Sequence, residues 1–162
     1  MRINIENDEN IIASLPKIWK NEVGLRGFFS KSKEGFLVLT NKNLIFVPEW
    51  IFITVKDREK FFGGNEVKVS TIDGYTETKL DEDISEHSAS VIIPLASIVE
   101  VESVKLRRST YLRVRFKSEN GKIKAYDFGV ALAITNYPIR QPLQILALDW
   151  NPWVKVVRAY LS

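Results

Sequence analysis

The stretch GFLVLTNKNLIFV at residues 35–47 decides the fold of this chain, because it consists of two apolar runs separated by a short polar segment. The polar residues 40–43 have the length of a tight hairpin loop, and the asparagines among them adopt the positive φ that such turns require more readily than most residues. Alternate side chains of a strand share one face, so we expect Leu37 and Leu39 to face Leu44 and Phe46. The stretch therefore predicts an antiparallel β-hairpin and says little about function.

Composition limits the class of protein. A chain of 162 residues that is 45% hydrophobic and 27% charged suits one domain with a sizeable core. It has no cysteine, which excludes disulfides and thiolate metal sites, and its single His, single Met and two Gln are typical of thermophile proteins. We find neither a run of about 18 apolar residues nor a signal-peptide pattern, so we expect a cytoplasmic protein, with peripheral membrane association as an option.

The net charge of +3 is distributed unevenly. Residues 1–90 hold 12 Lys and Arg against 15 Asp and Glu, whereas residues 91–162 hold 11 against 5. The second half of the chain is therefore expected to face an anionic partner.

A second stretch, IPLASIVEVE at residues 93–102, follows the first with a characteristic order of residues. Together with residues 35–47 and the region 91–129, it resembles the pleckstrin-homology (PH)-like superfamily, in particular its GRAM and bacterial PH-like branches. This resemblance implies a mainly β, PH-like barrel of two roughly orthogonal antiparallel sheets, with about seven strands and a closing C-terminal α-helix. Residues 1–162 would then form a single domain, with residues 48–90 as an elaborated insertion after the third strand.

Many PH domains hold an inositol phosphate with spaced basic residues between their first two strands. Arg26, Lys31 and Lys33 occupy roughly that region, but the usual Lys…Lys/Arg-x-Arg spacing is absent. The departure from the pattern argues against specific phosphoinositide binding there.

The insertion is predicted to be partly ordered. Asp73-Gly74 between residues 66–72 and 75–80 is typical of a type I′ hairpin, and the following residues 81–86 are acidic. Four aromatic residues of the insertion are candidates for membrane or partner contact. They are Trp50, Phe52, Phe61 and Phe62. In the alternative interpretation, Ile51, Ile53 and Val55 alternate as a strand and the aromatic side chains pack over one end of the barrel.

We find no pattern typical of a metal site. Asp81, Asp83 and Ser85 imitate the start of a calcium-binding loop, but Glu86 and Ile92 stand where an EF-hand has Gly and Glu. His87 has no second His or Cys in the chain, so a zinc site would need support from carboxylates, and we expect it to be solvated. The prediction is no metal, no cofactor and no catalytic residues.

The sequence YLRVRFK at residues 111–117 alternates as a strand with a basic face. A three-residue loop with Gly121 in the left-handed region would pair Leu112 with Phe128, Val114 with Tyr126 and Arg113 with Asp127. This register leaves Arg115 and Lys117 without partners. The candidate anion- or partner-binding residues are Lys105, Arg107, Arg108, Arg113, Arg115 and Lys117. Solvated strand-face charges and masking by residues 81–86 are the alternatives.

The end of the chain divides into two parts. Residues 130–148 are apolar but contain Asn136, Pro138 and Pro142, which favours a packed connection with little regular structure. Asn151 is then expected to cap a helix with Pro152 at its first position. The apolar face of this helix includes Trp153, the inward Trp that the PH-like resemblance implies.

These features predict a non-catalytic binding or scaffolding module that presents a basic sheet face to an acidic protein partner or an anionic membrane surface. Nucleic acid is disfavoured, because Tyr111 is the only aromatic residue on the basic face of the strand at residues 111–117, and stacking on bases normally needs more. Two alternatives remain open: a homo-oligomer assembled through the apolar insertion, and an enzyme without a recognised site.

Overall fold

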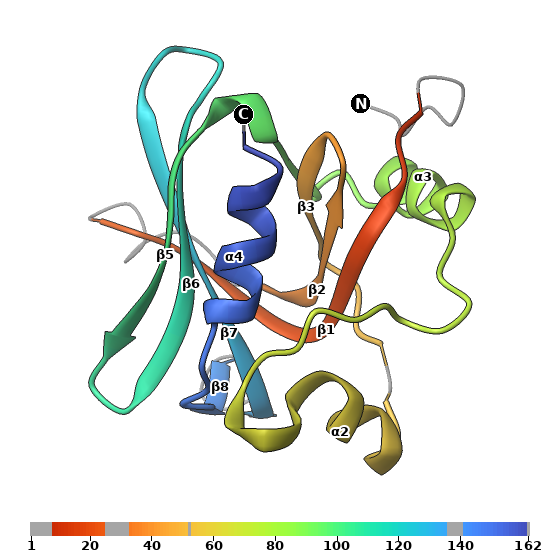
Figure 1. The fold of residues 1–162 in the computed structure, drawn as a ribbon, viewed down its shortest axis with the longest axis vertical. Helices are drawn as coiled ribbons and strands as arrows, with labels where there is room; N and C mark the ends of the chain where they lie inside the picture. Colours follow the sequence, from red (N-terminus) through yellow and green to blue (C-terminus); the bar gives the residue numbers. More distant parts are fainter. Residues whose placement is uncertain (1–7, 25–32, 52, 136–140, 162) are drawn as a thin grey trace.

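The computed structural model describes residues 8–24, 33–51, 53–135 and 141–161 and shows a mainly β protein (Figure 1). Its strands are β1 (Ile11–Glu22), β2 (Lys33–Thr40), β3 (Asn43–Val47), β4 (Val91–Pro94), β5 (Ile98–Leu106), β6 (Ser109–Lys117), β7 (Ile123–Thr135) and β8 (Gln141–Ile145). The helices are α2 (Val55–Phe62), α3 (Glu77–Glu86) and α4 (Asn151–Ala159), with short 3₁₀ helices η2 (Gly63–Asn65) and η3 (Leu95–Ser97).

The predicted hairpin is confirmed as β2 and β3. Leu37 pairs with Phe46 and Leu39 with Leu44, as the alternation predicts. The turn does not use an asparagine with positive φ. Instead the Thr40 hydroxyl accepts hydrogen bonds from the backbone N–H groups of Lys42 and Asn43 at 3.1 and 2.8 Å. A side-chain acceptor therefore replaces the special backbone conformation.

The strands form an antiparallel sheet in the order β4-β3-β2-β1-β7-β6-β5, and β8 pairs with β7. Strand β1 pairs with β2 along most of its length and with β7 at its C-terminal end. A register shift between Leu15 and Ile18 interrupts it, where Lys17 has φ +61°. Pro16 lies within this irregular part of β1, which explains how a strand between two others accommodates a proline.

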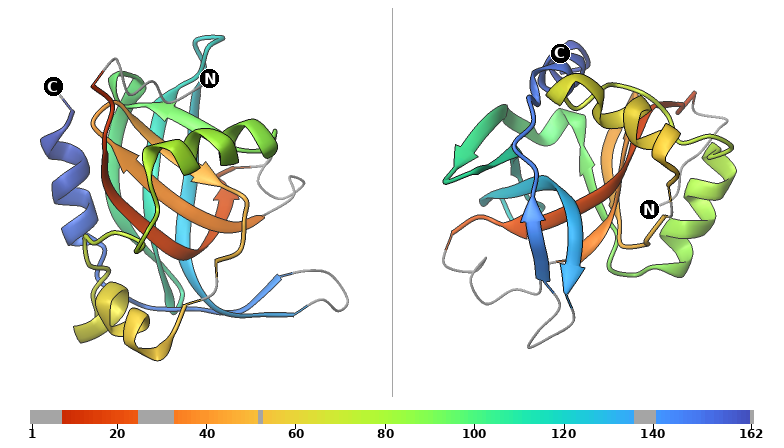
Figure 2. Two further views of the ribbon diagram at one scale, coloured as in Figure 1. Left: turned by 90° about the vertical axis from the view of Figure 1, so that its right-hand side faces the viewer. Right: turned by 90° about the horizontal axis from the view of Figure 1, so that it is seen from below.

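Both faces of the β2–β3 hairpin are buried. Leu37, Leu39, Leu44 and Phe46 belong to the main core inside the curved sheet. The opposite faces of β2 and β3 pack against Leu80 and Ile84 of α3. Figure 2 shows α3 lying across these strands. The hairpin is therefore apolar on both sides because a helix covers its outer face.

The hairpin predicted around Asp73-Gly74 is wrong. In the described part of residues 48–90 the structure has α2, η2 and α3. Gly74 (φ +75°) does make a turn, but Thr76 then caps α3 by accepting a hydrogen bond from the Lys79 N–H at 3.2 Å. Leu80 and Ile84 are one helical turn apart and both buried, which is why this segment is a helix.

The region 130–148 is also more regular than predicted. Strand β7 continues to Thr135, and β8 pairs with it, with Ala131 opposite Ile145 and Thr135 opposite Gln141. Pro142 is tolerated because β8 pairs on one side with β7 at the margin of the sheet. Residues 136–140 lie outside the described residues.

The predicted C-terminal helix is confirmed as α4. It begins at Asn151 with Pro152 in its first turn, and Trp150 is the capping residue in place of the predicted Asn151. Trp153 is fully buried, and its indole N–H donates to the Lys68 carbonyl at 3.0 Å. The guanidinium of Arg158 donates to the Val101 carbonyl of β5 at 2.8 Å. The helix therefore packs against the main core and the β5 edge.

Candidate functional site

The basic strand β6 has the alternation and the register that the sequence predicts. Leu112, Val114 and Phe116 are buried. The predicted pairs of β6 with β7, including Arg113 with Asp127, are all present. The loop is closed by the hydrogen bond from the Ser118 N–H to the Lys122 carbonyl at 2.8 Å, and Gly121 has φ +84°.

Two of the candidate cations are neutralised by carboxylates. Arg113 makes two hydrogen bonds to Asp127, which raise the pKa of its guanidinium. Arg115 lies opposite Glu100 of β5, with 4.0 Å between Nε and the carboxylate, so the prediction that Arg115 lacks a partner is wrong. The reason is that Glu100 and Glu102 alternate on β5 and face Arg115 and Arg113. The middle of β6 is thus a cross-strand network with little free charge.

The remaining candidate cations lie at opposite ends of β6. Lys105, Arg107 and Arg108 form the tip of the β5–β6 hairpin, at the lower left in Figure 1, whereas Lys117 ends β6 at the upper left. A strand rises about 3.4 Å per residue, so these two ends are separated by roughly 27 Å. The six predicted residues therefore do not converge on one site.

The tip of the β5–β6 hairpin combines charge with an apolar side chain. Lys105, Arg107 and Arg108 are exposed, and none of them takes part in the ion pairs found among the described residues. Leu106, between them, is 47% exposed. Arg107 has φ +58°, in the left-handed region that favours glycine. We call residues 105–108 the basic tip.

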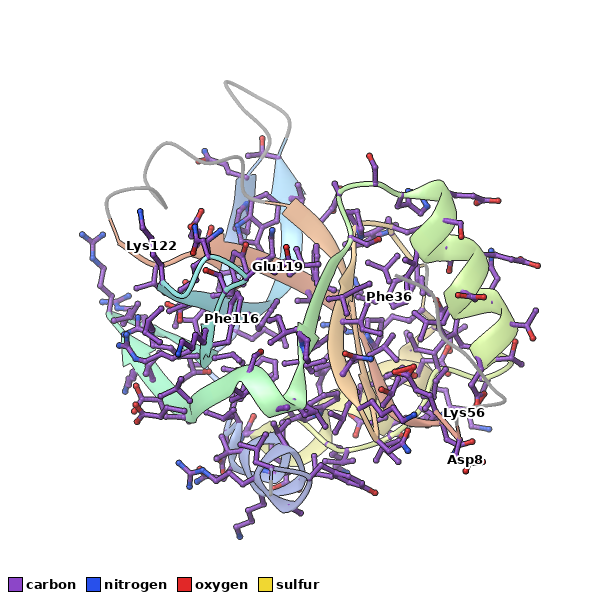
Figure 3. The ribbon with its side chains drawn as sticks, turned by 90° about the horizontal axis from the view of Figure 1, so that it is seen from above. Asp8, Phe36, Lys56, Phe116, Glu119 and Lys122 are labelled. Carbon is purple, nitrogen blue, oxygen red and sulfur yellow. The ribbon has the colours of Figure 1, made fainter. Side chains whose placement is uncertain are left out.

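An open pocket of about 810 Å³ lies at the other end of β6, between β4 and the β6–β7 hairpin (Figure 3). Phe116 and Tyr126, whose rings stack at 5.6 Å between centroids, are among its lining residues, together with Lys117 and Lys124. The Ser90 hydroxyl, also at this pocket, is buried without a hydrogen-bond partner among the described atoms. Lys117 thus belongs to this pocket and not to the basic tip.

The aromatic residues predicted for membrane or partner contact do not form one exposed surface. Phe61 is buried in the main core at 2% exposure, and Phe62 packs against that core, so Phe61 is not a contact residue. Trp50 is 43% exposed, with the Lys17 ammonium 5.2 Å from its ring centroid. The predicted strand through Ile51, Ile53 and Val55 is wrong, because Thr54 caps α2 and Val55 begins it. Phe52 lies outside the described residues.

Arg26 and Lys31 lie outside the described residues, and Lys33 begins β2.

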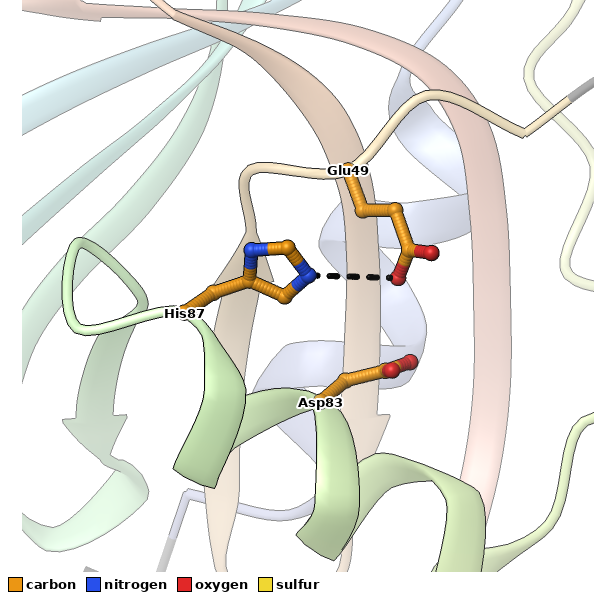
Figure 4. Close-up of side chains that lie close together, drawn as sticks. All are labelled: Glu49, Asp83 and His87. Carbon is orange, nitrogen blue, oxygen red and sulfur yellow. Dashed lines mark ion pairs between the residues drawn. The ribbon is translucent and has the colours of Figure 1, made fainter.

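The acidic residues 81–86 lie within α3, over the outer face of β2 and β3. Figure 1 shows α3 and the β5–β6 hairpin at opposite sides of the molecule, so these acidic residues do not mask the basic face of β6. We predicted that His87, the C-cap residue of α3, is solvated, but its side chain is only 33% exposed. It lies beside Glu49 and Asp83 (Figure 4).

Neither a family model nor a curated protein sequence matches the chain. Among the described residues, no helix is both long and apolar enough to cross a membrane.

Proposed function

We propose that this chain is a PH-like, non-catalytic binding module that attaches to an anionic membrane surface through the basic tip. The strand order, the long β1 that pairs with both β2 and β7, and the C-terminal helix with its buried Trp153 support the PH-like assignment. Folds of this kind serve many functions, so the function rests on the tip itself.

The observation that carries the proposal is the make-up of the basic tip. Three cations that form no ion pair within the described part of the chain flank the exposed Leu106 at the end of a hairpin. Such a tip can place basic side chains among lipid headgroups and an apolar side chain at the acyl boundary. An acidic protein surface would satisfy the cations but would not require the leucine.

The backbone of the tip gives independent support. Arg107 occupies a left-handed conformation in which a residue with a Cβ is strained by about 1–2 kcal/mol. Gly would relieve that strain, yet the turn carries two arginines. Strain of this kind is typical of functional sites, where a side chain serves binding at the expense of stability.

The experiment is co-sedimentation with vesicles of neutral lipid alone or with added anionic lipid, at low and moderate salt. Wild-type protein is compared with Lys105→Gln/Arg107→Gln/Arg108→Gln. Each cation near an anionic surface contributes about 1 kcal/mol, so the triple variant should bind roughly 100-fold more weakly. Binding should also decrease with salt, because screening weakens exposed charges.

The matched control is Lys117→Gln/Lys122→Gln/Lys155→Gln, which removes the same number of charges from exposed residues away from the tip. We expect it to retain most of the binding. If the control loses binding and the tip variant retains it, charges of the β6–β7 hairpin or of α4 bind the vesicles and the proposal is wrong. If wild-type protein does not bind anionic vesicles at low salt, the basic tip is better explained as a site for an acidic protein partner.

A further inference from the structure

Three potential metal ligands from two separate elements meet beside α3. The ligand atoms of Glu49, Asp83 and His87 all lie within 4.8 Å of one another, and His87 Nε2 is 3.7 Å from a Glu49 carboxylate oxygen. Figure 4 shows the three side chains directed toward a common space. Bonds of 2.0–2.2 Å in a tetrahedral zinc site place neighbouring ligand atoms about 3.4 Å apart. Small side-chain rotations would therefore bring these atoms into ligating positions.

The two elements are held in place by the apolar cluster under α3. Leu80 and Ile84 pack against β2 and β3, so they hold the helix that carries Asp83. The backbone N–H of His87 donates to the backbone carbonyl of Asp83 at 2.9 Å, and the backbone N–H of Glu49 donates to that of Val47 at 2.8 Å. The backbone at each ligand is thus ordered before any ion binds.

Asp83 is oriented in the way that ligating carboxylates usually are. Its side chain is fully buried and accepts hydrogen bonds from the Tyr75 hydroxyl at 2.8 Å and the Lys79 ammonium at 2.9 Å. Each bond uses one oxygen, and a carboxylate has about four acceptor positions, so both oxygens retain the capacity to bind a cation. Donors in this arrangement fix the orientation of a metal ligand.

The electrostatics of the cluster favour a cation. Two carboxylates lie within 4.8 Å of each other at the C-terminal end of α3, where the helix dipole adds partial negative charge. The one ammonium bonded to Asp83, that of Lys79, belongs to a side chain that is 48% exposed. The Lys79 ammonium takes one acceptor position of Asp83 Oδ1 and can remain there while a divalent ion uses another.

We propose that Glu49, Asp83 and His87 bind a divalent transition-metal ion of the zinc type, which ties the chain after β3 to the C-terminus of α3. One imidazole and two carboxylates match the ligands of Zn²⁺ or Co²⁺, whereas Mg²⁺ and Ca²⁺ prefer oxygen alone. Three protein ligands leave one tetrahedral position for water. This site is separate from the basic tip, and its test is independent of vesicle binding.

The test uses the full chain with Zn²⁺ in calorimetry and Co²⁺ in NMR. Because His87 is the only histidine and the chain has no cysteine, its ring signals report on the site without assignment. We expect one saturable site, loss of the His87 ring signals with Co²⁺, and an increase in Tm with Zn²⁺. Glu49→Gln and His87→Asn should each weaken binding by more than about tenfold, since even changes around a ligand cost 10–100-fold.

The matched control is Glu82→Gln, which removes an exposed carboxylate from the same helix. It should bind Zn²⁺ as wild type does. The proposal is overturned if His87→Asn abolishes binding while Glu49→Gln leaves it unchanged, because that result describes a lone imidazole. It is also overturned if the wild type shows no saturable binding, in which case the cluster is an ion pair only.

Discussion

Arg113 donates hydrogen bonds from Nε and Nη2 to the two carboxylate oxygens of Asp127, at 2.8 and 2.9 Å. Both side chains are largely buried, at 16% and 7% exposure. A two-point contact of this kind fixes the guanidinium and the carboxylate relative to each other and is among the stronger hydrogen-bonded pairs in proteins. Arg113 therefore joins β6 to β7 and is not free to hold a partner.

We expect Arg113→Ala to lower the free energy of unfolding by about 2–3 kcal/mol, because it leaves the Asp127 carboxylate buried without its partner. Arg115→Ala should cost less than about 1 kcal/mol, since Arg115 and Glu100 are 37% and 49% exposed. Urea unfolding of the two variants measures this difference. Equal costs for both would contradict a structural role for the Arg113–Asp127 pair.

Alternation in the sequence was sufficient to predict the β2–β3 and β6–β7 hairpins. The apolar periodicity of residues 35–47 and 111–117, with a loop of defined length, determined which side chains face each other, including Leu37 with Phe46 and Arg113 with Asp127. Buried faces of strands allow one register only, so pattern and turn length together specify the pairing. The closing helix was predictable for a similar reason, because the apolar residues of α4 recur at helical spacing.

Contacts between segments distant in sequence were not predictable. Asp73-Gly74 is a hairpin signal, but the apolar outer faces of β2 and β3 are covered by a helix, which packs Leu80 and Ile84 against them. Glu49 and His87 are 38 positions apart, and nothing in their local sequence indicates that they meet. The pairing of Arg115 with Glu100 could have been found, since the VEVE alternation on β5 puts both glutamates on one face.

Gly35→Ala should be the most destabilising single methyl addition in the β2–β3 hairpin. A Cβ at this position would lie 2.0 Å from the Val47 carbonyl oxygen and 2.9 Å from the Cα of Pro48. Both are backbone atoms in or beside a paired strand, so they cannot move aside without breaking the β2–β3 ladder. We expect a loss of about 3 kcal/mol or failure to fold, measured by thermal and urea unfolding.

The control is Gly64→Ala, where a Cβ would meet nothing within 4 Å but φ is +70°. It should lower the free energy of unfolding by about 1–2 kcal/mol, from backbone strain alone. A smaller loss for Gly35→Ala than for Gly64→Ala would mean that the β2–β3 packing is looser than the structure shows.

Arg107→Gly should stabilise the fold and weaken vesicle binding at the same time. Glycine adopts the left-handed conformation at φ +58° without strain, but it also raises the entropy of the unfolded chain. The free energy of unfolding should therefore increase by about 0.5–1 kcal/mol. Loss of one cation should reduce binding to anionic vesicles about fivefold, at about 1 kcal/mol per charge. Urea unfolding and vesicle co-sedimentation of the same preparation measure both effects.

Arg108→Gly is the matched control, because Arg108 is not among the residues with positive φ. It should weaken vesicle binding to a similar degree but lower stability by about 0.5 kcal/mol, since glycine adds unfolded-state entropy without relieving strain. If both variants change stability in the same direction, strain at Arg107 is not the reason for its effect.

The start of α2 should loosen in acid because of Asp57. The Thr54 N–H donates to the Asp57 carboxylate at 3.1 Å, and the Asp57 N–H donates to the Thr54 hydroxyl at 3.2 Å, which together form a capping box. These contacts lower the pKa of Asp57 below its ordinary value. The hydrogen bond from the Thr54 backbone has the larger effect, and the one with the Thr54 side chain adds to it. A carboxyl group with a lowered folded-state pKa stabilises the folded form above its unfolded pKa of about 4, and that stabilisation is lost as the pH falls through the folded value.

NMR Cα shifts of residues 55–62 between pH 6 and pH 2 measure this effect. In the wild type their helical character should decrease below about pH 4, whereas in Asp57→Asn it should be lower at pH 6 and change little with pH. Glu77→Gln, at the first turn of α3, serves as the control and should leave the titration of α2 unchanged. The capping role of Asp57 is refuted if Asp57→Asn and the wild type show the same pH dependence, because the acid response would then arise elsewhere in the chain.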